Sequence, residues 1–150
     1  MIQLADTETR SAMVQRLARL TADHAALWGQ MNAHQAVCHL CDSFRLPLGR
    51  KAASDASGFV QRTLIKWIAL RAPMAWPKGV DTRPEMKQGV GGTPPGDFVR
   101  DRGELVTLIE EFAALREIPV AHPIFGPMTR EEWMRWGYLH IDHHLRQFGA

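Results

Sequence analysis

The chain has 150 residues, of which 45% are hydrophobic and 23% are charged, and its formal net charge is +2. This composition is ordinary for a soluble globular protein, the length suits one domain over residues 1–150, and no apolar run approaches the roughly 20 residues that cross a membrane. The weak net charge, without a basic tail or an aromatic-basic repeat, argues against nucleic acid as a partner.

Two amphipathic helices are predicted in the first third of the chain. Residues 7–21 carry apolar side chains at helical spacing between polar ones, namely Met13, Val14, Leu17 and Leu20. A second helix is expected to begin at Asn32, whose side chain can cap it, with Gln35 at the reciprocal capping-box position. It should end before Pro47, because a proline disfavours helical backbone geometry at the residue before it.

The middle of the chain predicts a third helix followed by a long loop. Residues 58–71 are rich in large apolar side chains, and Pro73 ends the pattern. The segment 72–96 contains five prolines and five glycines, which indicates irregular structure. Met74, Trp76 and Met86 are expected to anchor this loop to the body of the protein. Loops of this kind often cover functional sites.

Two further helices complete the prediction. Residues 97–115 carry a buried stripe that consists of Leu105, Leu108, Ile109 and Phe112. After a turn at residues 122–127, the last helix is expected to begin at Thr129, with Glu132 at the capping-box position. No strand alternation or repeat is visible, so the predicted fold class is an all-α helix bundle.

The last predicted helix holds a pair of histidines at metal-binding spacing. His140 and His144 are separated by about 40° around the helix axis, so both imidazoles can reach one divalent ion. Trp133 and Trp136 fall on the same stripe, and we therefore expect the pair to face the core. Zinc proteases place a glutamate directly after the first histidine, but Ile141 stands there, so no general base is aimed from that position.

The second helix offers several candidates for a third ligand. His34 and His39 are about 140° apart around the axis, so they cannot both point along one narrow stripe, and periodicity does not choose between them. Cys38 and Cys41 would alternatively complete a closed structural zinc site with the histidine pair. The simpler interpretation of these cysteines is two small buried apolar side chains. The residues alone leave the third ligand open.

Two histidines have other expected roles. His143 lies beside the pair on the last helix and is expected to be exposed. His122 precedes Pro123 and is expected to be a turn residue.

The basic residues of the chain are concentrated in its middle. Between Arg45 and Lys87 there are nine lysines and arginines against three acidic residues. This excess can attract an anionic small molecule, although a solvated basic face is the simpler interpretation.

The N-terminus and the cysteines indicate the compartment. Residues 1–6 are neither basic nor followed by a hydrophobic stretch, so no secretory signal is predicted. The two cysteines lie three residues apart in one predicted helix, which does not favour a stabilising disulfide. We expect a cytoplasmic protein with no membrane partner.

Several segments of the chain together resemble a known family. They are Trp28–His34, Cys38–Leu40, His122–Gly126, Glu132–Trp133 and, most specifically, His140–Gly149. Over most of its length the chain is similar to the DinB superfamily of metal-binding four-helix bundles, and in particular to a branch of small bacterial proteins of unassigned function. The resemblance implies a DinB-like four-helix bundle with an extra helix and a long Pro/Gly-rich loop.

The resemblance also implies a metal site. In the superfamily one histidine late in an internal helix joins two from the final helix, and the matching positions here are His39, His140 and His144. Zinc or nickel is implied, with one coordination position left open for water or substrate. Characterised relatives include thiol-dependent transferases and isomerases, so a low-molecular-weight thiol and a small-molecule substrate are implied partners. No catalytic residue can be assigned in this way.

Two functions from different classes fit these observations. The first is a metal-dependent enzyme, either a thiol-dependent S-transferase or a related hydrolase. The alternative is a non-catalytic metal-binding or stress-response bundle that binds a ligand, which the lack of a visible general base favours. An apolar face on the third helix favours a homodimer in either case.

Overall fold

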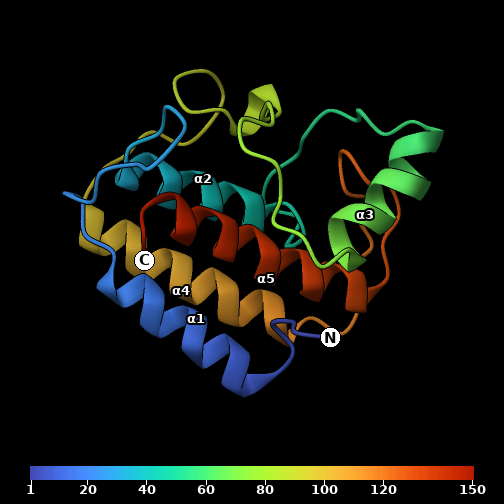
Figure 1. Ribbon diagram of the computed structural model, residues 1–150, viewed down its shortest axis with the longest axis horizontal. Coiled ribbons are helices and arrows are strands. Elements are labelled where there is room, and N and C mark those ends of the chain that lie inside the picture. The colour runs from blue at the N-terminus through green and yellow to red at the C-terminus, as the bar shows by residue number, and fades with distance from the viewer.

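The computed structural model describes residues 1–150 and contains helices but no strand (Figure 1). The five α-helices are α1 (Thr7–Arg19), α2 (Ala33–Arg45), α3 (Lys66–Arg71), α4 (Phe98–Ala114) and α5 (Arg130–Gln147). A π-helical segment, η1 (Gln61–Ile65), leads into α3, and a 3-10 turn, η2 (Pro84–Met86), interrupts the loop that follows. The all-α prediction is confirmed. None of these helices combines the length and the apolar character that crossing a bilayer requires.

Side-chain caps set the helix starts. Asn32 and Gln35 form a reciprocal capping box at the start of α2, and Thr129 and Glu132 form another at the start of α5. Asp97 caps α4 by accepting a hydrogen bond from the Arg100 amide. These predicted starts are confirmed, because a cap satisfies backbone donors that the helix itself leaves free.

The four long helices α1, α2, α4 and α5 lie side by side (Figure 1). Helices α1 and α2 each contact both α4 and α5. Phe44, Phe112 and Trp136 pack against one another in the core between these helices. Gly137 allows α5 to pack closely against Leu4, since a Cβ at this position would lie 2.8 Å from Leu4 Cδ1. This packing turns one face of α5 inward, the face that carries the histidine pair.

The third helix stands apart from these four and leaves most of its apolar side chains in solvent. Residues 59–71 form one continuous helical stretch that projects at one end of the molecule (Figure 1). Phe59 is 83% exposed and Trp67 is 58% exposed, whereas Leu70 is buried. Lys66 faces the protein, where its Nζ bonds to the Pro127 carbonyl and pairs with Glu132.

The loop over residues 72–96 is irregular apart from η2, as predicted. Trp76 is half-buried and its Nε1 donates to the Ala69 carbonyl at 2.7 Å, and Met86 is buried. These two residues anchor the loop. The prediction for Met74 is wrong, because its side chain is 65% exposed.

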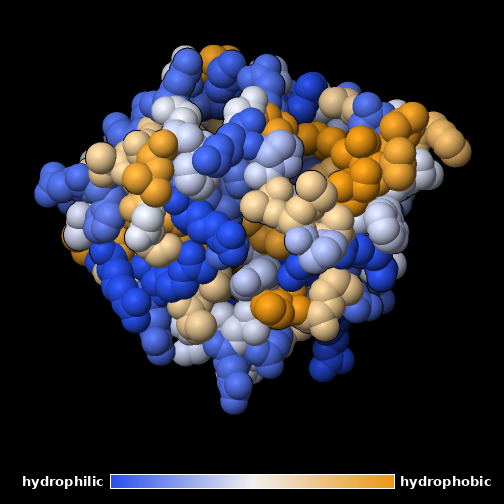
Figure 2. Space-filling model, viewed as in Figure 1, coloured by the Kyte–Doolittle hydropathy of each residue, from blue (hydrophilic) through white to orange (hydrophobic).

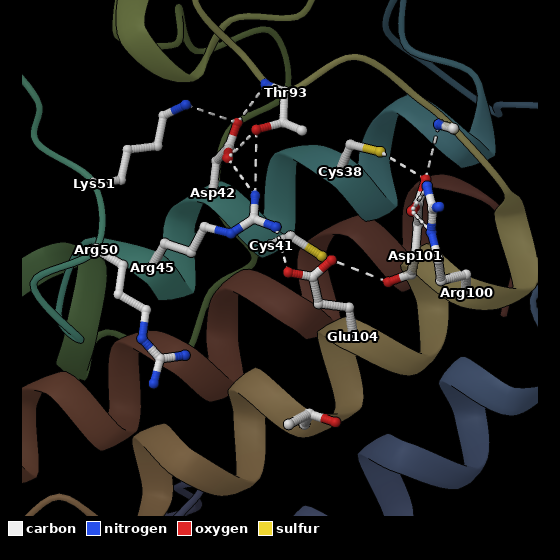
Figure 3. A network of polar contacts seen from close by, with 12 residues as sticks. Cys38, Cys41, Asp42, Arg45, Arg50, Lys51, Thr93, Arg100, Asp101 and Glu104 are labelled. Carbon is white, nitrogen blue, oxygen red and sulfur yellow. Dashed lines mark hydrogen bonds and ion pairs between the residues drawn. The ribbon is translucent and has the colours of Figure 1, made fainter.

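A buried carboxylate fastens the end of this loop to α2. Asp42 accepts hydrogen bonds from the backbone amide and the hydroxyl of Thr93, each at 2.7 Å (Figure 3). Arg45 and Lys51 pair with the same carboxylate at 2.8 and 3.2 Å. The loop is therefore held beside α2.

Candidate metal centre

The three histidines His39, His140 and His144 lie together between α2 and α5. One ring nitrogen of each lies within 4.8 Å of the other two. The Nε2 atoms of His39 and His140 are 3.2 Å apart. His39 and His144 are buried, whereas His140 is partly exposed. Tertiary packing thus brings His39, and not His34, to the histidine pair, a choice that helical periodicity left open.

Hydrogen bonds on the outer nitrogens orient two of the three rings. His39 Nδ1 lies 3.2 Å from the Met86 carbonyl, and His144 Nδ1 lies 2.8 Å from Gln147 Oε1. Both partners are acceptors, so each Nδ1 carries the proton and each Nε2 keeps a lone pair. Gln147 is held in turn, because its Nε2 donates to the Trp28 carbonyl at 2.9 Å. Outer partners of this kind typically fix metal-binding histidines.

Burial keeps these imidazoles neutral. It lowers the pKa of His140 and of His144 well below the usual range, and the neighbouring histidines lower both further. Burial also lowers the pKa of His39. None of the three rings forms a hydrogen bond with a carboxylate. Three neutral imidazole nitrogens that converge in this way suit zinc or nickel, so this group can hold a metal ion.

The two cysteines face α4 and not this group. Cys38 Sγ lies 3.7 Å from Asp101 Oδ2, and Cys41 Sγ lies 3.6 Å from the Asp101 carbonyl (Figure 3). The alternative in which both thiols complete a closed zinc site with His140 and His144 is therefore wrong. Both cysteines are buried and free. Burial is the largest cause that raises the pKa of each thiol to about 12.

A pocket of about 290 Å³ lies beside the three histidines. Its aromatic lining is Trp28, Trp76 and Tyr138, and its basic lining is Lys78, Arg135 and Arg146. His143 forms part of its wall and is half-buried, so the expectation of an exposed His143 is wrong. None of the three histidines lines this pocket, but Trp76 does, and its ring centroid lies 5.8 Å from that of His140.

Sequence reasoning missed this pocket because its walls come from distant parts of the chain. Ile2 precedes α1, Trp28 precedes α2, residues 72–76 and Lys78 belong to the loop after α3, and the remaining walls lie on α5. Only the local excess of basic residues gave a signal. Six of those nine residues pair with acidic side chains: Arg45, Arg50, Lys51, Arg62, Lys66 and Lys87. Lys78 instead faces the pocket, with Nζ 4.5 Å from the Trp28 ring centroid.

Comparison with known proteins gives a family without an activity. A family model described as "Protein of unknown function (DUF1569)" matches residues 2–150, a span that includes every helix and all three histidines. No curated protein and no solved structure matches the chain. The geometry of the site must therefore carry the functional argument.

Proposed function

The chain belongs to the DUF1569 family, and we propose that it is a metal-dependent enzyme in which His39, His140 and His144 hold a zinc or nickel ion. One observation carries this proposal. Three neutral imidazole nitrogens from α2 and α5 converge within 4.8 Å, and two of the rings are oriented by hydrogen bonds to their outer nitrogens.

We also infer that the family is a branch of the DinB superfamily. Four long helices that lie side by side support this inference. Further support comes from the origin of the histidines, since one comes from an internal helix and two come from the final helix at His-x-x-x-His spacing. The single family match over residues 2–150 supports one domain.

The proposed reaction is a thiol-dependent S-transfer or a related hydrolysis. When bound, the metal would lower the pKa of a thiol and supply a thiolate nucleophile at neutral pH. The lack of a carboxylate at the three histidines favours S-transfer over hydrolysis, because a thiolate held by the metal would need no general base from the protein. Arg146 already pairs with Asp142, a carboxylate of the same pocket, at 2.8 Å. Lys78 and Arg135 would therefore hold an anionic group of the thiol or its electrophile. Trp28 and Trp76 would exclude water.

Metal analysis of the purified, tag-free chain tests this proposal. We expect the wild type to bind at least about one zinc or nickel ion per chain and His144→Ala to bind about one fewer. The metal-loaded protein should then transfer sulfur from a low-molecular-weight thiol to an electrophile, and Lys78→Ala should raise KM more than it lowers kcat. A wild type that binds neither metal after incubation with both would overturn the proposal.

A second candidate function is a non-catalytic metal-binding or stress-response bundle. It is favoured because none of the three histidines lines the pocket, whereas Trp76, which contacts His140, does. Full metal occupancy without turnover, together with a melting temperature that rises with metal, would support this function over the enzyme.

We further propose a homodimer that forms through the apolar face of η1 and α3. Figure 2 shows apolar residues gathered where this helical stretch projects, and its exposed apolar members are Phe59, Val60, Leu64, Ile65, Trp67 and Ile68. Each of these side chains is at least 36% exposed, and an apolar surface of this kind typically marks an interface. A second copy fits this face because Lys66 is turned inward and leaves the apolar surface without its charge.

A further inference from the structure

A second cluster of metal-ligating side chains lies between α2 and α4. His34 and Cys38 are one turn apart on α2, and Asp101 lies near the start of α4. His34 Nε2 lies 2.8 Å from Asp101 Oδ2, and Cys38 Sγ lies 3.7 Å from the same oxygen (Figure 3 shows Cys38 and Asp101). One ligand atom of each residue lies within 4.8 Å of the other two. Imidazole, thiol and carboxylate therefore converge on one point.

The cluster is sheltered but reachable from solvent. Cys38 and Asp101 are 3% and 8% exposed. The His34 side chain is 17% exposed, so the cluster reaches the surface at this ring. The ring of Phe98 packs edge-on against His34 and limits its movement. The exposed edge of the His34 ring is the side from which a small cation would reach the cluster.

Contacts outside the cluster hold the Asp101 carboxylate in place. The Gly96 amide donates to Oδ2 at 2.9 Å, and the Arg100 guanidinium lies 3.4 Å from Oδ1. Arg100 thus occupies the oxygen that faces away from His34 and Cys38. Its side chain is 72% exposed, so water screens its charge from the cluster.

We propose that His34, Cys38 and Asp101 form a second site for a zinc-like divalent cation, separate from the three-histidine group. Nitrogen, sulfur and oxygen donors are the ligands that zinc accepts. A tetrahedral zinc site with bonds of about 2.0–2.3 Å separates its ligand atoms by about 3.3–3.7 Å. The 3.7 Å from Cys38 Sγ to Asp101 Oδ2 lies at the end of this range, and the 2.8 Å hydrogen bond from His34 Nε2 would lengthen by about half an ångström when a cation binds. A fourth position remains for water at the exposed edge.

Cation binding at this site releases one proton. Without a cation, the His34 N–H and the Cys38 S–H both donate to Asp101 Oδ2. On binding, the thiol proton passes to solvent and the imidazole proton moves from Nε2 to Nδ1. The thiolate and the carboxylate then balance both positive charges, so the buried site carries no net charge.

Cobalt(II) tests the proposal, because a thiolate ligand gives a charge-transfer absorption band in the near ultraviolet and the three-histidine group contains no sulfur. We expect the reduced wild-type chain to develop this band on titration with cobalt. Cys41→Ala is the matched control, since it removes the other buried thiol of α2, and it should keep the band. Cys38→Ala should lose the band and about one bound cobalt ion per chain, and Asp101→Asn should weaken cobalt binding about tenfold or more.

A wild-type chain without this band at saturating cobalt overturns the proposal, as does a band that survives Cys38→Ala. Circular dichroism checks the fold of each variant, and Cys38→Ser replaces Cys38→Ala if the latter does not fold. His144→Ala separates the two sites. A band that persists there while about one cobalt ion per chain is lost supports both, and a band without any cobalt loss supports this site and contradicts the three-histidine centre.

Discussion

His144 Nδ1 lies 2.8 Å from Gln147 Oε1, less than one helical turn further along α5, and both side chains are buried. The amide of Gln147 also donates to the Trp28 carbonyl, far away in the sequence. One glutamine therefore connects a candidate metal ligand to the segment before α2. This connection fixes the proton of His144 on Nδ1 and leaves Nε2 for the metal.

Replacing Gln147 should weaken metal binding without removing a ligand. We expect Gln147→Leu to lower zinc affinity about 10- to 100-fold, because His144 loses the acceptor that orients its ring. Competition with a chromophoric chelator measures this change. Gln147→Glu should bind zinc more tightly than Gln147→Leu, since a carboxylate also accepts from His144 Nδ1. Equal affinities for the wild type and Gln147→Leu would contradict the proposed orientation.

The parts of the fold that could be predicted depend on local chemistry. The starts of α2 and α5 follow from Asn32 with Gln35 and from Thr129 with Glu132, because a capping box lies within four residues of sequence. The surroundings of Trp67 could not be predicted in the same way. An apolar helix indicates burial, but it does not say whether the same chain supplies the cover.

In the candidate site too, local chemistry could be predicted and tertiary packing could not. The His140 and His144 pair follows from helical spacing alone, and the resemblance to a known family added His39. The acceptors that orient these rings could not be predicted, since Met86 lies in an irregular loop and its carbonyl has no sequence signal. Tertiary packing alone brings that carbonyl to His39.

Asp42 should be more important for stability than an exposed carboxylate. Burial opposes ionisation of Asp42, but hydrogen bonds from Thr93, Arg45 and Lys51 outweigh it and lower the pKa. We expect Asp42→Asn to reduce the free energy of unfolding by about 3 kcal/mol. Lys51 loses its only carboxylate partner in this variant, and Arg45 keeps only its pair with Glu104. Urea denaturation measures this. Asp55→Asn is the control, since its exposed pair with Arg62 should contribute less than about 1 kcal/mol, and equal effects of the two variants would contradict the argument.

A charge on the apolar face of α3 should prevent dimer formation. Trp67 is 58% exposed, so Trp67→Glu has little effect on the fold of one chain, but it would bury an unpaired carboxylate between two copies. Light scattering should give the mass of a dimer for the wild type and of a monomer for the variant. Glu8→Gln, on the exposed start of α1, is the control and should remain dimeric. A monomeric wild type at high concentration would exclude the proposed homodimer.

His122 is a turn residue, as predicted, but it is also buried in the core. Its Nδ1 accepts hydrogen bonds from the backbone amides of Ile124 and Phe125, each at 3.1 Å. Its ring stacks on Phe125 and contacts Trp133. Burial lowers the pKa of His122 to about 3, whereas the ordinary value is 6.5. In the folded chain, the His122 imidazole is therefore neutral.

This pKa shift predicts a loss of stability in acid. Above pH 6.5 the imidazole is neutral in both states, and its contribution to stability is fully present. As the pH falls from 6.5 towards 3, the unfolded chain takes up a proton that the folded chain excludes, so the free energy of unfolding falls by at most about 1.4 kcal/mol per pH unit. His122→Asn removes this term, because asparagine does not titrate and its Oδ1 can accept from the same amides. Urea denaturation at several pH values should give a shallower pH dependence for the variant, and parallel curves for the two proteins would show that His122 does not titrate in this way.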